Sequence, residues 1–133
     1  MEIRDIESET AALVNRERAA EGIPALTLSG GLTYIARRKS RDMWMNRELN
    51  HFSPTYGSPF DMLAMFGVSF TSAAENIAMG FQTPESVMDA WMNSQGHRSN
   101  MLNPVFTEIG VGYYSDPGDP RGGPYWTQLF VRR

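Results

Sequence analysis

Apolar side chains recur at helical spacing along two long stretches of the chain, which predicts two amphipathic helices. The first stretch covers residues 4–20 and has its apolar centre at Leu13 and Val14. The second covers residues 30–49, and its apolar positions are Leu32, Ile35, Ala36 and Met43. Each stretch therefore has a face that can pack against the rest of the chain.

Local signals indicate where these helices end and where shorter ones begin. Gly22 is typical of the residue that follows a helix, and Ser29 is typical of an N-cap for the second helix. Pro59 opens a short helix, and Thr83, followed by a proline and an acid, begins a third amphipathic one. A further short turn of helix is expected at residues 98–102.

The C-terminal part of the chain shows the two-residue spacing of strands, which predicts two strands that form a hairpin. Ile109, Val111 and Tyr113 share one face of the first strand, and the second strand has Trp126, Gln128 and Phe130 on one face and Thr127, Leu129 and Val131 on the other. The strands are residues 108–114 and 125–131, and the Pro-, Gly- and Asp-rich residues 115–124 are expected to be an exposed loop between them. Residues 72–80 are interpreted as a short extended or irregular segment. Helices followed by a hairpin favour one α+β domain over residues 1–133, with an antiparallel sheet.

The charged residues give no sign of a polyanionic partner. The chain has 12 Lys and Arg against 15 Asp and Glu, a formal net charge of −3, so we expect no nucleic-acid binding. The charged runs at residues 15–18 and 37–41 are interpreted as helix faces exposed to solvent.

The sequence also argues against a membrane-spanning protein and against cysteine chemistry. No apolar run approaches the roughly 18–20 residues that span a bilayer, so no transmembrane segment is expected. The charged start of the chain does not read as a signal peptide. The absence of cysteine excludes disulfides, a thiolate nucleophile and a cysteine-based zinc site.

The residues best suited to chemistry are the two histidines, His51 and His97, together with Glu75. Glu75 interrupts a small apolar run, residues 73–78, so we expect it to be partly buried and to need a partner. Neutral imidazoles and a carboxylate are ligands of zinc, and three such ligands plus water form an open, catalytic type of site. The alternative is that each residue is satisfied separately by local hydrogen bonds.

Two polar neighbours of these residues are further candidates for ligand binding. Asn76 either lines the same cleft or caps a backbone group. Arg98 either clamps a carboxylate or phosphate, or bridges a helix end to the following loop, with Glu108 as a possible partner. Some serines lie near the histidines, but no Gly-x-Ser-x-Gly motif supports a serine nucleophile.

Five segments stand in a characteristic order along nearly the whole chain. They are residues 13–18 with 24–26, His51–Pro54, Ala74–Ala78, Trp91–Leu102, and the strand segments 108–112 with 125–128. Together they resemble the CAP superfamily of cysteine-rich secretory, antigen 5 and pathogenesis-related proteins. The cysteine-free chain is most similar to the bacterial SCP-like extracellular branch of that superfamily.

This resemblance implies an α-β-α sandwich, in which a small antiparallel sheet lies between helical layers beside a large cleft. In many members of the family the cleft holds two histidines and two acids, and some members bind zinc or another divalent ion there. His51, Glu75 and His97 match three of these positions, whereas the second acid is replaced by Ser94. The resemblance also implies an extracellular or cell-envelope location.

Three functions are therefore open at this point. The leading hypothesis is a secreted CAP domain that binds a small ligand, a lipid, a protein partner or a divalent metal, and the residue types favour zinc. Its ligand-binding residues would be His51, Glu75, Asn76, His97 and Arg98, and its metal ligands would be His51, Glu75 and His97. The alternatives are a metal-dependent hydrolase of peptide or cell-wall material, with Glu75 as base, and a structural envelope or spore-layer component.

Overall fold

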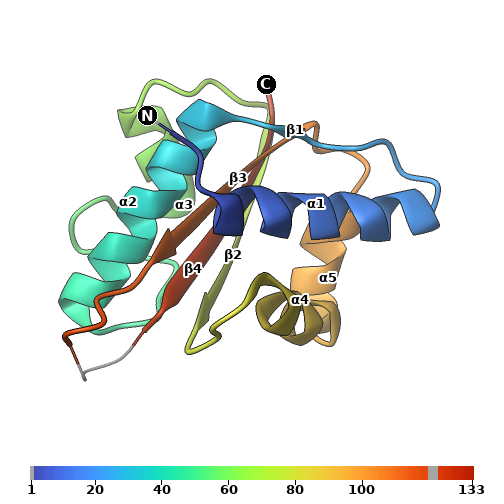
Figure 1. The fold of residues 1–133 in the computed structure, drawn as a ribbon. Helices are drawn as coiled ribbons and strands as arrows, with labels where there is room; N and C mark the ends of the chain where they lie inside the picture. Colours follow the sequence, from blue (N-terminus) through green and yellow to red (C-terminus); the bar gives the residue numbers. More distant parts are fainter. Residues whose placement is uncertain (1, 120–122) are drawn as a thin grey trace.

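A four-stranded sheet lies between two layers of helices in the computed structural model, which describes residues 2–119 and 123–133 (Figure 1). The helices are α1 (Asp5–Ala20), α2 (Gly30–Asn46), α3 (Pro59–Met65), α4 (Pro84–Met92) and α5 (Gln95–Leu102). The strands are β1 (Thr27–Leu28), β2 (Ser72–Met79), β3 (Glu108–Tyr114) and β4 (Tyr125–Arg132). The predicted α-β-α sandwich is confirmed.

The strands follow the order β1-β3-β4-β2, so the described part of the sheet ends in β1 on one side and in β2 on the other. The predicted hairpin of β3 and β4 is confirmed, and residues 72–80, expected to be extended or irregular, form β2 along the other side of β4. The prediction of a purely antiparallel sheet is wrong at one edge, because β1 pairs in parallel with β3. With two residues, β1 is too short to show an alternating pattern.

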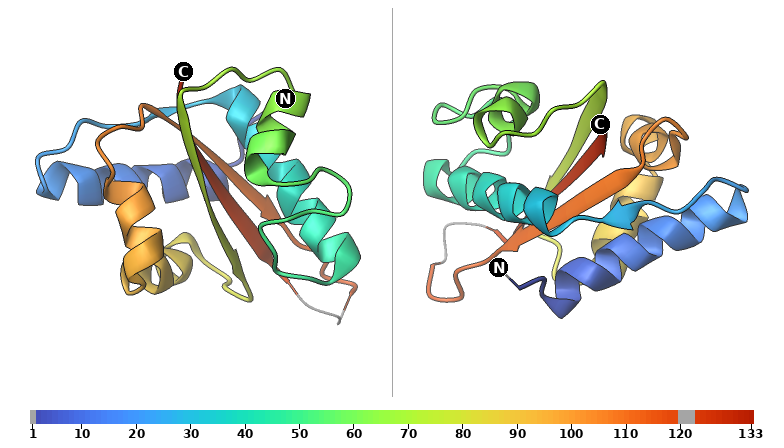
Figure 2. Two further views of the ribbon diagram at one scale, coloured as in Figure 1. Left: turned by 180° about the vertical axis from the view of Figure 1, so that it is seen from behind. Right: turned by 90° about the horizontal axis from the view of Figure 1, so that it is seen from above.

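Both faces of the sheet are covered, which explains why β4 is buried at every residue except its last. Figure 2 shows α2 and α3 on one side of the sheet and α1, α4 and α5 on the other. Alternate strand residues face the two layers, as a pleated strand requires. Ile109, Val111, Trp126 and Phe130 pack in the layer of α1, α4 and α5, whereas Leu129 and Val131 pack with α2 and α3.

The backbone of α2 lies directly against β3 at two glycines. A Cβ added to Gly110 would lie 2.3 Å from the carbonyl carbon of Leu32, and one added to Gly112 would lie 2.1 Å from that of Ala36. Ser40 then donates a hydrogen bond of 3.0 Å from its hydroxyl to the Gly112 carbonyl. This close contact fixes how far α2 stands from the sheet, and with it the position of every side chain that α2 points inward.

The helix starts follow the predicted caps, but two helix boundaries differ. Ser29 and Thr83 accept hydrogen bonds from the first turns of α2 and α4, as predicted. Helix α2 ends at Asn46 because Arg47 adopts a left-handed conformation with φ of 53°. Helix α5 begins at Gln95, three residues before the predicted start at residue 98.

Two charged side chains that were expected to face solvent are buried. Arg18 is 1% exposed, and so is Lys39. Arg18 fastens the end of α1 to the segment around the end of α5 by donating to the carbonyls of Pro24, Met101, Asn103 and Phe106. Both residues follow an apolar core residue by four positions, so each lies on the inward face of its helix.

The predicted loop at residues 115–124 includes residues 120–122, which lie outside the described residues. On either side of that gap the loop contains no helix or strand, as expected. Among the residues that the structure describes, no helix has both the length and the apolar character needed to cross a membrane.

Candidate functional site

The predicted site residues come together around β2, a strand at the edge of the sheet. Glu75 and Asn76 are consecutive residues of β2, so their side chains point to opposite faces of the sheet. Glu75 meets Lys39 of α2 and His51 from the loop after α2. Asn76 meets His97 and Asn100 of α5. The site is therefore built around the sheet edge, with one histidine supplied from each side.

His51 and Glu75 form a direct pair, with 2.8 Å between Nδ1 of the imidazole and Oε1 of the carboxylate. The Glu75 side chain is 1% exposed, whereas that of His51 is 55% exposed. Because a carboxylate accepts hydrogen bonds, Nδ1 of His51 carries the hydrogen and Nε2 keeps a free lone pair. The predicted burial of Glu75 beside a partner is confirmed, and the bond fixes the orientation of the His51 ring.

Lys39 is a site residue that sequence reasoning missed. Its ammonium nitrogen lies 3.9 Å from Oε1 of Glu75, and it donates a hydrogen bond to the backbone carbonyl of His51. Burial lowers the pKa of Lys39, and the nearby carboxylates of Glu75 and Asp42 oppose that effect. Its spacing of four residues from Ile35 and from Met43, both in the apolar stripe of α2, is the signal that could have identified it.

Asn76 connects β2 to α5 and thereby positions His97. It is completely buried, and its amide nitrogen donates to the His97 carbonyl at 3.1 Å and to the Gln128 side chain at 3.0 Å. Its amide oxygen accepts from the side chain of Asn100 at 2.9 Å. Of the two roles predicted for Asn76, the structure shows the contact with a backbone group.

His97 is half-buried near the start of α5. Burial lowers its pKa, and the charge of His51 lowers it further. His97 is therefore a neutral imidazole at neutral pH.

Arg98 and Ser94 complete the set of predicted positions. Arg98 donates to the carbonyl of Met92 at 3.2 Å, so it bridges to the end of α4, as in the second of its predicted roles. Its predicted pairing with Glu108 is wrong, because that carboxylate binds Arg133 at 2.8 Å. Ser94 is the N-cap residue of α5 but makes no capping hydrogen bond with its side chain.

Residues 11–130 match the CAP, or cysteine-rich secretory protein, family. This chain belongs to the CAP family. It is 50% identical to the YkwD protein of Bacillus subtilis (strain 168) over 125 residues, which cover 94% of this chain and 46% of that protein. The predicted resemblance to the bacterial branch is thus confirmed.

Solved structures extend the comparison of this CAP domain to three dimensions. An extracellular protein with an SCP domain from Bacillus anthracis superposes with a TM-score of 0.87 at 34% identity, over 96% of this chain and 40% of that one. An outer surface protein from Borrelia burgdorferi gives 0.88 at 19% identity, which shows the shared fold alone. The chain spans less than half the length of the two Bacillus proteins.

The predicted three-ligand zinc site of this CAP domain stays a prediction. Within residues 2–119 and 123–133, no three His, Asp or Glu side chains are grouped so that they could hold a metal ion. Oε1 of Glu75 already faces His51 and Lys39, while its Oε2 is buried without a hydrogen-bond partner among the described residues. These contacts suit a carboxylate that orients His51 better than one that binds an ion directly.

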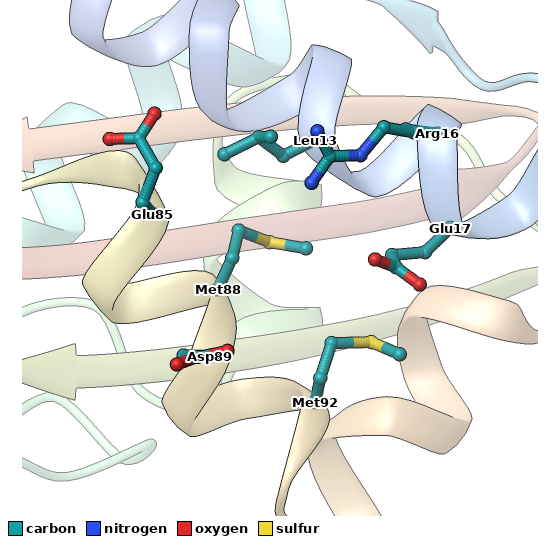
Figure 3. A pocket seen from close by; sticks show the side chains of 7 residues that line it. All are labelled: Leu13, Arg16, Glu17, Glu85, Met88, Asp89 and Met92. Carbon is teal, nitrogen blue, oxygen red and sulfur yellow. The ribbon is translucent and has the colours of Figure 1, made fainter.

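A cavity of about 310 Å³ lies between α1 and α4 of the CAP domain, apart from the histidines (Figure 3). Met88 and Met92 line it together with the charged groups of Arg16, Glu17, Glu85 and Asp89. None of the predicted site residues lines this cavity. The expected large cleft at the histidines stays a prediction.

Proposed function

We propose that this CAP domain is an extracellular binding domain whose histidine pair, His51 and His97, anchors a ligand without hydrolysing it. The observation that carries the proposal is the 2.8 Å bond between His51 Nδ1 and Glu75. That bond holds a half-exposed ring in place and leaves its Nε2 unengaged by Glu75, and His97, whose pKa is lowered by burial, would supply the second imidazole.

A divalent transition-metal ion such as zinc is the ligand that a pair of imidazoles fits best. His51, through Nε2, and His97 would hold the ion, which would supply a Lewis-acidic contact for an oxygen or nitrogen atom of a partner molecule. Glu75 would orient His51, as carboxylates commonly do for histidines that bind metals. Lys39 supports this orienting role, because its buried positive charge already compensates the negative charge of Glu75.

The placement of Glu75 favours binding over hydrolysis. A general base must come within hydrogen-bond reach of the water that it activates. The Glu75 side chain is 1% exposed, and its Oε1 is 2.8 Å from His51. A hydrolase would need a different base near the histidines. The extracellular location proposed here is supported by the description of the Bacillus anthracis relative as an extracellular protein.

Titration calorimetry with zinc at about pH 7.5 tests the proposal, because a metal ion binds an imidazole only in its neutral form. The wild type is expected to bind one ion per chain, and His51→Ala and His97→Ala are each expected to abolish that binding. Glu75→Gln keeps an oxygen that accepts from His51 Nδ1, so it is expected to weaken binding by only about tenfold, as for an orienting residue.

The pattern across the variants decides between the possible outcomes. Loss of binding in Glu75→Gln as complete as in the histidine variants would make Glu75 a direct ligand and would revive the three-ligand site. The absence of binding to the wild type, or binding that survives the loss of either histidine, would overturn the proposal.

A further inference from the structure

The outer surface of α2 carries a basic cavity that the histidine site does not use. The cavity has a volume of about 400 Å³ and is lined by Arg4, Tyr34, Arg37, Arg38, Arg41 and Tyr114. We name it the arginine-lined cavity. Its residues come from α2, from the residue before α1 and from the end of β3.

Helical spacing places the arginines of α2 together. Residues 37 and 38 each stand three or four positions from residue 34 and from residue 41, so the four side chains share one face of the helix. The opposite face of α2, which includes the buried Lys39, packs on the sheet. The run of positive charge at residues 37–41 is therefore divided, with Lys39 in the histidine site and the arginines outside.

Two of the arginines share one acid. Arg37 donates to Glu7 with 2.7 Å between Nε and Oε2, and Arg4 donates to the same oxygen at 3.0 Å. Arg37 also donates to the backbone carbonyl of Glu2. The single carboxylate of Glu7 thus faces two guanidinium groups. The negative charge of Glu2 also acts on Arg37, so the positive charge on this side of the cavity is largely compensated.

Arg38 is held in place by neutral groups that leave its charge uncompensated. It donates to the Tyr56 hydroxyl at 2.9 Å and to the Tyr34 hydroxyl at 3.5 Å. Its guanidinium carbon also lies 5.8 Å from the ring centroid of Tyr34 and 6.0 Å from those of Tyr56 and Phe66. These contacts fix the guanidinium before a ligand arrives, which reduces the entropy that binding would cost.

Arg41 is exposed and forms no hydrogen bond or ion pair with any residue that the structure describes. The neighbouring acid, Asp42, is turned inward and accepts a hydrogen bond from Ser53 at 2.6 Å. Arg38 and Arg41 therefore present two uncompensated guanidinium groups at one cavity. Tyr114, which packs against Trp44 with 5.1 Å between ring centroids, forms part of the opposite wall.

We propose that the arginine-lined cavity binds a phosphate group carried by a larger molecule. Paired guanidinium groups recognise phosphate oxygens through charge-assisted hydrogen bonds, and the hydroxyl of Tyr34 can add a further donor. The cavity is also large enough to hold part of the group that carries the phosphate, against the rings of Tyr34 and Tyr114. The proposal is independent of the histidine site, so either can fail without the other.

The test is a titration of ¹⁵N-labelled protein with inorganic phosphate at low ionic strength, followed by NMR. Phosphate is expected to shift the backbone amides of residues 34–41 and of Tyr114 saturably. Arg41→Gln is expected to weaken binding about tenfold, because it removes a charged donor. Arg132→Gln, which removes an exposed arginine at the end of β4, is the matched control and is expected to bind like the wild type.

Arg38→Gln is the second variant and is expected to weaken binding at least as much as Arg41→Gln. Because Arg38 also packs on aromatic rings, Arg41→Gln decides if Arg38→Gln does not fold. The absence of saturable shifts at the cavity, or equal affinity in Arg41→Gln and Arg132→Gln, would overturn the proposal.

Sedimentation with vesicles identifies the source of the phosphate. Retention on phosphatidylglycerol vesicles but not on phosphatidylcholine vesicles, lost in Arg41→Gln, would assign a lipid headgroup. Phosphate binding without retention on either vesicle would assign a soluble phosphate compound. Both results support the phosphate site.

Discussion

Replacing Lys39 with methionine removes the buried positive charge beside Glu75 while it keeps a side chain of similar length. The side chains of Lys39 and Glu75 are each 1% exposed. The variant therefore leaves the buried Glu75 carboxylate with His51 as its remaining partner. Breaking a buried pair in this way costs about 3–5 kcal/mol. Burial of Lys39 is itself unfavourable, as its lowered pKa shows, so we expect a loss near the lower end of that range.

Urea unfolding at about pH 7.5 measures this loss, which corresponds to a decrease in melting temperature of about 10 °C for a chain of this length. The matched control is Arg41→Met on the exposed face of the same helix, which is expected to change stability by no more than about 0.5 kcal/mol. Glu75→Gln removes the negative charge that Lys39 compensates. Together with Lys39→Met and the double variant, it completes a double-mutant cycle.

The cycle is expected to show a coupling energy of at least about 1 kcal/mol between the two residues, with the double variant more stable than the sum of the single losses implies. Two results would refute this reasoning. One is a Lys39→Met variant as stable as the Arg41→Met control. The other is additivity between Lys39→Met and Glu75→Gln, which would mean that the 3.9 Å approach carries no energy.

Three further variants test the fold and the site. Gly112→Ala is expected to cost about 3 kcal/mol in urea unfolding, because its Cβ would meet the backbone of α2. Asn76→Ala is expected to cost about 2–4 kcal/mol, because it removes three hydrogen bonds of a buried side chain, and to shift the NMR signals of α5; an unchanged spectrum would contradict its positioning role. Burial lowers the pKa of His97, so its neutral form stabilises the fold fully above the ordinary value of about 6.5 and this contribution is lost as the pH falls below it. The urea midpoint should therefore drop less between about pH 7.5 and pH 5 in His97→Gln than in the wild type, and equal drops would contradict this assignment.

Much of the fold could be predicted because its signals are local. Ser29 and Thr83 stand where the helices begin, since their hydroxyls accept from the free N–H groups of a first turn. The alternation along β3 and β4 correctly assigned their two faces, because each face packs on a different layer of helices. Such signals depend on a few neighbouring residues and not on the rest of the chain.

The features that could not be predicted depend on contacts between distant segments. Strand β1 exists because Thr27 and Leu28 pair with β3, about 80 positions later in the chain. Arg18 is buried because four carbonyl groups, three of them around the end of α5, accept its hydrogen bonds. The sequence shows that Arg18 lies on the inward face of its helix, but it does not show the distant carbonyl groups that make its burial possible.

The site could be predicted only in part, because some of its contacts join distant segments of the chain. The composition of the segment around Glu75 indicated a buried carboxylate that needs a partner, and His51 supplies one. The sequence could not indicate that Lys39 would be the second partner, because a positive run on a helix is usually solvated. That difference matters for function, because Lys39 favours an orienting role for Glu75 over a role as metal ligand.

The proposed binding function requires that His51 is held through Nδ1 and offers Nε2 to a ligand that His97 also contacts. Long-range ¹H–¹⁵N NMR of the imidazole rings during a zinc titration at about pH 7.5 tests it most directly. We expect zinc-free His51 to be the tautomer with hydrogen on Nδ1, and we expect zinc to shift its Nε2 signal together with the signals of the His97 ring. Hydrogen on Nε2 of His51, or zinc that shifts neither ring, would contradict it.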